Sequence, residues 1–143
     1  MVNIKIEKIF SDAILPSYAH PGDAGMDVFS YETYILKPGE RRLFKTGLKV
    51  EISEGYEMQI RPRSGLALNQ GVTVLNTPGT IDAGYRGEVG VILINHGEKV
   101  YSIKKGDKIA QAVISSVERA VLEKVEKLEE SSRGEGGFGS TGK

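Results

Sequence analysis

Residues 88–95 read EVGVILIN, in which apolar side chains alternate with small or polar ones. Alternation with a period of two predicts a β-strand that buries one of its faces. The preceding stretch, NTPGTIDAGYRG at 76–87, is rich in glycine and contains a proline. Together the two stretches predict a β-hairpin with a long connection, in which Gly84 and Gly87 leave room for another group to approach the backbone.

Five further runs show the same alternation, wholly or in part. They are VNIKIEKIF (2–10), RLFKTGLKVEI (42–52), YEMQIRP (56–62), VTVLN (72–76) and KIAQAVISSV (108–117). Short turn-forming stretches such as KPGE, SEG and KKGD separate the runs. Many short strands between regularly spaced turns predict an all-β sandwich or barrel.

Two stretches depart from this pattern. SGLALNQG at 64–71 predicts a short helix, with Ser64 as its N-cap and Gly71 at its end. In residues 118–132, apolar side chains recur at helical spacing, whereas the all-β context favours strands, so the local pattern leaves both open. The polar, glycine-rich stretch that follows predicts a mobile tail.

The composition predicts one soluble, cytoplasmic domain. The chain has 143 residues, and 19 basic side chains balance 19 acidic ones, which argues against general binding to nucleic acid or to anionic membranes. Without cysteine there is no disulfide framework and no thiolate metal site. No apolar run has the length of a signal peptide or a membrane span.

Arg61, Arg63 and Ser64 lie in the stretch RPRSGLA. Two guanidinium groups, a hydroxyl and the N–H groups of a helix start form an anion site. The alternative is a capped helix whose arginines are solvated.

Three polar residues each admit two interpretations. Asp82 is a candidate general base for water, with Tyr85 packed against a sugar, or an aspartate that hydrogen-bonds its own turn. Asp27 and Gln111 are candidates for the outer shell of a magnesium ion bound to phosphates. The alternative for both is a buried polar group that the main chain satisfies.

Five stretches together resemble the motifs of the homotrimeric dUTPase family. They are AGMDVFS, RPRSGLA, NTPGTIDAGYRGEVGVILIN, GDKIAQAV and RGEGGFGSTG, in that order. The resemblance runs from about Ala24 to Gly142. It implies a jelly-roll-like homotrimer with active sites shared between subunits, and strands rather than a helix at 118–130. It also divides the chain into one β domain, 1–130, and a flexible arm, 131–143, that closes over bound nucleotide.

The resemblance implies an activity as well. The family hydrolyses dUTP to dUMP and pyrophosphate with magnesium, which keeps uracil out of DNA and supplies dUMP for thymidylate synthesis. Asp82 is the implied catalytic base, and Asp27 is implied to reach magnesium through water without direct ligation. The implied phosphate-binding residues are Arg63, Ser64, Gly65, Gln111, Arg133, Gly139, Ser140 and Thr141. The residues implied to hold uracil and deoxyribose are Asn76, Gly79, Thr80, Ile81, Tyr85, Gly90 and Phe138.

The match to the family's pattern is incomplete at two positions, and two other functions stay open. Lys108 stands where arginine is frequent in the family, and Ala112 where a larger apolar residue is common. A dCTP deaminase of the same superfamily is one alternative, although the stretch IDAGYRG lacks the glutamate expected there and the chain has no tryptophan. A dUTP-binding sensor without catalysis is the other.

Overall fold

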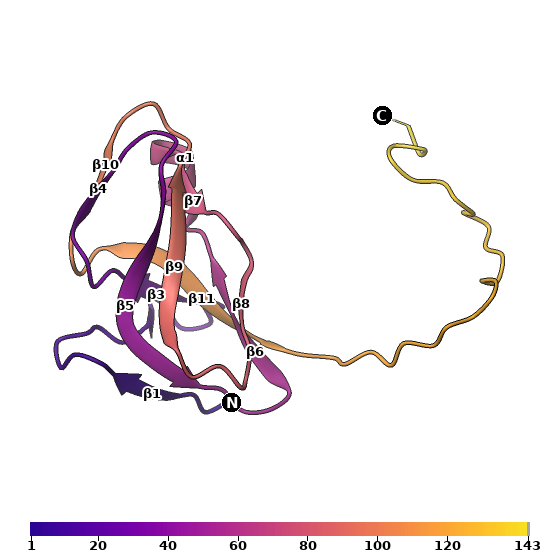
Figure 1. Ribbon diagram of the computed structural model, residues 1–143, viewed down its shortest axis with the longest axis horizontal. Helices are drawn as coiled ribbons and strands as arrows, with labels where there is room; N and C mark the ends of the chain where they lie inside the picture. Colours follow the sequence, from indigo (N-terminus) through magenta and orange to yellow (C-terminus); the bar gives the residue numbers. More distant parts are fainter. Residues whose placement is uncertain (143) are drawn as a thin grey trace.

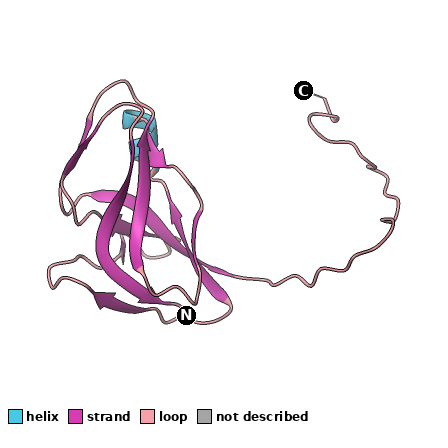
Figure 2. Ribbon diagram, viewed as in Figure 1, coloured by secondary structure: helices cyan, strands magenta, loops and turns pink. Residues whose placement is uncertain are grey.

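The structure, a computed structural model, describes residues 1–142 and is built almost entirely of β-strands (Figures 1 and 2). The elements are β1 (Lys5–Lys8), β2 (Ser17–Tyr18), β3 (Gly25–Phe29), β4 (Tyr34–Leu36), β5 (Arg41–Glu51), β6 (Tyr56–Arg61), α1 (Ser64–Gln70), β7 (Val72–Val74), β8 (Gly79–Ile81), β9 (Glu88–Asn95), β10 (Tyr101–Ile103) and β11 (Lys108–Ser116). The prediction of an all-β fold with one short helix is confirmed for the described part of the chain.

Two antiparallel sheets enclose the core in a jelly-roll-like arrangement. One has the strand order β1-β5-β9-β7 and the other β2-β3-β11-β6-β8, while β4 and β10 form a small third sheet. The inward side chains of both large sheets meet in one apolar cluster, of which Phe44, Leu93 and Ile60 are almost fully buried members. Strict alternation in β9, where every second residue is buried, follows from its position between β5 and β7 with one face on this core.

The predicted hairpin over 76–95 is wrong. β8 pairs with β6 in one sheet, and β9 pairs with β5 and β7 in the other. Residues 82–87 therefore cross from one sheet to the other, as Figure 1 shows. The local sequence carried the turn signal, but the pairing partners are distant in the chain and leave no local trace.

The short helix forms where predicted, but its N-terminal assignment is wrong. Ser64 is the first residue of α1, and Arg63 occupies the N-cap position with an extended backbone and no side-chain cap among the described residues. Gly71 ends the helix in the left-handed conformation, at φ 69°. A Cβ at Gly71 would lie 2.6 Å from the backbone nitrogen of Gly97, so the close approach also requires glycine.

The last strand ends at Ser116, and the Val117 N–H still donates to the backbone oxygen of Gly55 at 2.9 Å; beyond this contact the chain runs away from the β domain (Figure 1). Neither the helix nor the strands considered for 118–130 are present, which corrects the implied strands. Val121 and Leu122 are more than nine-tenths exposed, because the segment reaches neither the core nor a sheet edge of its own chain. Lys143, the end of the expected arm, lies outside the described residues.

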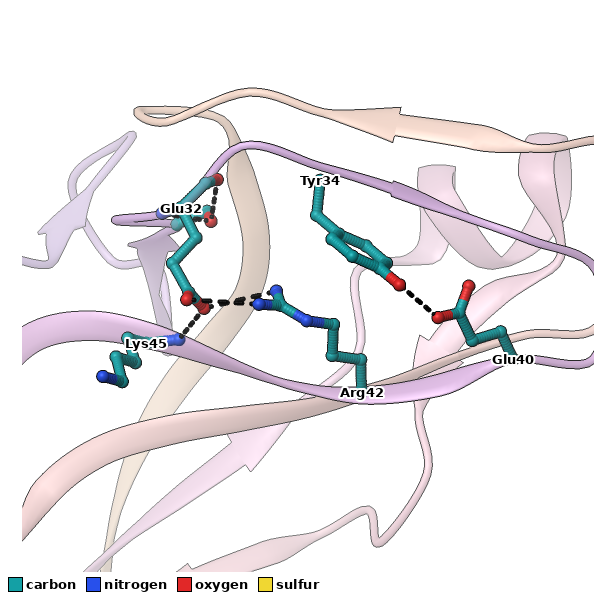
Figure 3. A network of polar contacts seen from close by, with 6 residues as sticks. Glu32, Tyr34, Glu40, Arg42 and Lys45 are labelled. Atoms are coloured by element: carbon teal, nitrogen blue, oxygen red, sulfur yellow. Dashed lines mark hydrogen bonds and ion pairs between the residues drawn. The ribbon is translucent and has the colours of Figure 1, made fainter.

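A polar network fastens the small sheet to β5 (Figure 3). The guanidinium of Arg42 lies 4.1 Å from the ring centroid of Tyr34 and pairs with Glu32 at 3.3 Å. The Tyr34 hydroxyl donates to Glu40, and this hydrogen bond holds the pKa of the Glu40 carboxyl below its usual value. The backbone N–H of Lys45 donates to Glu32 as well, so one carboxylate joins the loop before β4 to β5.

Candidate functional site

A cavity of about 570 Å³ opens where β3, β11 and the start of α1 meet. Five of the predicted site residues line it: Asp27, Arg63, Ser64, Gly65 and Gln111. Strands far apart in the sequence supply them, because β11 pairs with β3 on one side and with β6, which leads into α1, on the other. We call this hollow the cationic cavity after the Arg63 guanidinium, which lies there beside the carboxylates of Asp23 and Asp27.

Ion pairs hold the polar groups of the cationic cavity in place. The Asp27 carboxylate lies 3.4 Å from Nε of Arg63 through one oxygen and 2.7 Å from Nζ of Lys108 through the other. The Gln111 amide donates to the backbone oxygen of Pro62 at 2.9 Å. Gln111 is thus bonded to the main chain, whereas Asp27 is balanced by two side-chain cations.

Gly25 makes room for the Gln111 side chain. A Cβ built on Gly25 would lie 2.0 Å from Oε1 of Gln111, a distance that no pair of nonbonded atoms tolerates. Any larger residue at Gly25, which lies opposite Val113 of β11, would therefore force the Gln111 amide to move.

Tyr101 of β10 also lines the cationic cavity. Burial raises the pKa of its hydroxyl, and nearby Asp107 raises it further while Arg63 opposes the shift. The phenol therefore stays protonated over the physiological range and retains its ability to donate a hydrogen bond.

A second, narrower cavity of about 170 Å³ lies at the crossing between the sheets. We call it the crossing slot. Its lining includes the predicted residues Thr80, Ile81, Asp82, Tyr85 and Gly90. β8 supplies one rim and β9 the other, so the slot spans the two sheets.

The Tyr85 ring is fixed across the crossing slot. Its hydroxyl donates to the backbone oxygen of Glu88 at 2.9 Å. A Cβ at Gly87 would lie 2.3 Å from that hydroxyl oxygen, so Gly87 provides space for the ring. Asp82 is exposed beside it, and its backbone oxygen accepts from the Tyr85 N–H at 3.0 Å to close the turn.

Not every predicted residue lies in a cavity. Asn76 is exposed and Gly79 is buried, and both lie near the crossing slot without lining it. The predicted arm residues lie on the segment that runs away from the domain in Figure 1: Arg133, Phe138, Gly139, Ser140 and Thr141. The cationic cavity and the crossing slot have no lining residue in common among residues 1–142.

Sequence reasoning missed Tyr101 as a lining residue of the cationic cavity and Lys108 as the ion-pair partner of Asp27. The signal for Lys108 is the pair of consecutive apolar residues Ile109 and Ala110, which interrupts the alternation of β11. For Tyr101 the sequence carries no signal, because its place depends on the packing of β10 beside β4.

No helix in residues 1–142 is long and apolar enough to cross a membrane. The same residues include no cluster of three or more histidine, aspartate or glutamate side chains that could hold a metal ion.

The described residues thus form an all-β domain with two separate hollows, the cationic cavity and the crossing slot. A model of the dUTPase family matches residues 11–142. The deoxyuridine 5'-triphosphate nucleotidohydrolase of Clostridium tetani is 61% identical over 98% of this chain and 97% of its own length. The enzyme of the same name from Nautilia profundicola is 56% identical over 99% of this chain and 100% of its own length. The chain belongs to the dUTPase family.

Solved structures agree in fold. The dUTPase of Staphylococcus bacteriophage 80alpha, in complex with dUpNHpp, superposes with a TM-score of 0.90 at 32% identity over 98% of both chains. The dUTPase of phage phi11 of S. aureus gives a TM-score of 0.82 at 30% identity, over 90% of this chain and 99% of its own, and its structure is described as showing a structural Mg(II) ion.

Proposed function

We propose that the protein hydrolyses dUTP to dUMP and pyrophosphate. One observation carries the proposal: Asp82 is exposed at the rim of a slot whose lining comes from both sheets, in a chain that belongs to the dUTPase family. The relatives named above as deoxyuridine 5'-triphosphate nucleotidohydrolases support the same reaction.

Asp82 is the proposed general base. Its carboxylate accepts a proton from a water molecule, which attacks the α-phosphorus as the bond to the pyrophosphate leaving group breaks. Exposure keeps the carboxylate accessible to water. The two products are dUMP, which retains the attacking oxygen, and pyrophosphate.

The cationic cavity is the proposed phosphate site. Arg63 would pair with phosphate oxygens, while Ser64 and Gly65 would donate from a hydroxyl and from the backbone. Gln111 would support the same network from β11. These groups neutralise the charge that builds up on the leaving group as the bond breaks.

Magnesium, when bound with the triphosphate, would supply further positive charge at the phosphate oxygens. The residues fit an ion that arrives with the nucleotide: Asp27 is a cavity carboxylate, but both of its oxygens already face cations. A contact from Asp27 through a water molecule suits this arrangement better than direct ligation. We therefore propose Asp27 as a residue of the outer shell.

The crossing slot is the proposed base and sugar site. Main-chain groups of Gly79, Thr80, Ile81 and Gly90 and the side chain of Asn76 would pair with the edge of uracil, and the narrow wall would exclude a 5-methyl group. Tyr85 would pack under the deoxyribose and leave no space for a 2'-hydroxyl.

The complete site requires more than one chain in this proposal. The cationic cavity and the slot are separate in residues 1–142, and the arm lies away from both. A homotrimer, with sites formed between subunits, would join them. Arg133 and Phe138 would then reach the γ-phosphate and the uracil ring, while Gly139, Ser140 and Thr141 close around the phosphates.

Pyrophosphate release from dUTP, dTTP, dCTP and UTP, each with and without magnesium, tests the proposal. Release from dUTP alone is expected, and Asp82→Asn should still bind dUTP but lose most turnover. Parent-level hydrolysis by Asp82→Asn would refute the assigned base. Ammonia release from dCTP would identify a deaminase instead, and binding of dUTP without any release would identify a sensor.

A further inference from the structure

Lys108 forms the shorter of the two ion pairs of Asp27, a residue that lines the cationic cavity. Its Nζ lies 2.7 Å from Oδ2 of Asp27, whose side chain is only 14% exposed. Nε of Arg63 takes the other carboxylate oxygen at 3.4 Å. The backbone oxygen of Lys108 also accepts from the Arg63 guanidinium, at 3.4 Å. Lys108 thus contacts both members of the pair.

A bulge in β11 brings Lys108 to this face of the sheet. Gln111 lies opposite Asp27 in the β3–β11 ladder, so both side chains point to the same side. Lys108 precedes Gln111 by three residues and would face the other side of a regular strand. The register shifts between Lys108 and Ala110, which inserts one extra residue and returns Lys108 to the Asp27 side. The consecutive burial of Ile109 and Ala110 has the same cause.

We propose that Lys108 is a positioning residue for phosphate binding, acting on Arg63 through Asp27. The inference rests on the proposed function in that the anion is the triphosphate of the substrate. Lys108 occupies one carboxylate oxygen, so Asp27 engages Arg63 through the other oxygen alone. Nη2 of the guanidinium then stays available for phosphate, while Nη1 donates to the Lys108 backbone oxygen.

Charge and geometry both support this role. The charged residues that line the cavity, Asp23, Asp27 and Arg63, carry one net negative charge, which repels an anion, whereas Lys108 beside Asp27 brings the total to zero. Without Lys108, both carboxylate oxygens are free to engage the guanidinium side by side, the preferred geometry of an arginine–carboxylate pair. That geometry consumes the donors that a phosphate needs.

The test measures the binding of inorganic triphosphate by calorimetry. The protein is used as the whole chain of 143 residues, and EDTA removes divalent ions. Lys108→Met is expected to weaken binding about tenfold, and Lys108→Arg to restore it within about twofold. Lys108→Gln serves as a second neutral variant if the methionine variant folds poorly. For dUTP turnover, KM is expected to rise with the loss of affinity, while kcat changes less.

Lys105→Met is the matched control. Lys105 also pairs with an aspartate, Asp12, at 2.5 Å, but Asp12 does not line the cationic cavity, whereas Asp27, the partner of Lys108, does. This variant removes the same unit charge from the molecule and should bind triphosphate as the parent does.

Three results would overturn the inference. Neutral variants of Lys108 could bind triphosphate as tightly as the parent, or the parent could bind none. An equal loss of affinity in Lys105→Met is the third, since general charge would then explain the effect. Because this binding assay needs no hydrolysis, it is independent of the reaction. A parent that binds triphosphate through Lys108 but does not hydrolyse dUTP would refute the proposed function alone.

Discussion

Gly87→Ala should impair sugar recognition with little effect on the fold. The added methyl carbon would lie 2.3, 2.5 and 2.9 Å from the Oη, Cζ and Cε2 atoms of Tyr85. Ordinary contact between such atoms begins near about 3.5 Å, so the ring must retreat by about 1 Å. The hydrogen bond from the Tyr85 hydroxyl to the Glu88 oxygen then breaks or lengthens.

Stability and activity should respond differently to this change. The ring is 45% exposed and free to turn outward, so the lost hydrogen bond costs at most about 1 kcal/mol, or roughly 2–4 °C in Tm. A displacement of about 1 Å in a group that orients the substrate reduces kcat/KM by about 10- to 100-fold. We expect dUTP to lose more than UTP, because Tyr85 is proposed to exclude the 2'-hydroxyl.

Steady-state kinetics on dUTP and UTP, together with thermal melting, measure both effects. Gly84→Ala is the control in the same loop, since a Cβ there meets no atom within 4 Å. The reasoning is refuted if Gly87→Ala keeps the parent's preference for dUTP over UTP, or if Gly84→Ala loses it equally.

Deleting residues 133–143 should leave Tm within about 1 °C of the parent, because the segment described there makes no contact with the core, while dUTP turnover falls at least about tenfold. Asp12→Asn should make the free energy of unfolding depend less on pH in the acid range. Lys105 and a tyrosine hydroxyl hold the pKa of Asp12 below its usual 3.8, so its stabilising contribution is present above that pH and lost as the pH falls through the lower folded value. Asn95→Ala should lower the free energy of unfolding by about 2–4 kcal/mol, because the buried amide donates to two backbone oxygens and accepts from one N–H.

Three measurements check these expectations. An unimpaired rate in the truncated protein would contradict a closing arm. Chemical unfolding between pH 2 and pH 7 tests Asp12, and a constant stability difference between parent and variant would contradict the linkage. For Asn95, a loss below about 1 kcal/mol would show that water replaces the amide.

Strands with a clear period of two were predictable, whereas those defined by distant pairing were not. β9 follows from strict alternation because it buries one face along its whole length, and β5 and β11 follow from alternation over part of their length. β2 and β10 have two and three residues, too few for a period to show. The crossing between β8 and β9 depends on the choice of partner strand, which the local sequence does not encode.

The site shows the same division. From the sequence alone, Arg63, Ser64 and Asp82 were candidates for phosphate and water chemistry, each with a purely structural alternative, and their roles came from the family resemblance. That Asp27 lies within 3.4 Å of Arg63 depends on the β3–β11–β6 pairing, which no spacing in the chain reveals. The sequence marks Lys108 only as an unusual residue for the family. The side of the sheet to which its side chain points depends on the bulge in β11.

The rims of the crossing slot belong to different sheets, so the width of the slot depends on how far apart the core holds those sheets. Ile81 and Val89 line the slot and are also members of the core cluster. A library that varies the volume of buried side chains such as Phe44 or Val91 should therefore change the width of the proposed pyrimidine slot, although neither residue lines it. Efforts to engineer acceptance of a bulkier base should begin in the interior of the domain rather than at the residues that contact the ring.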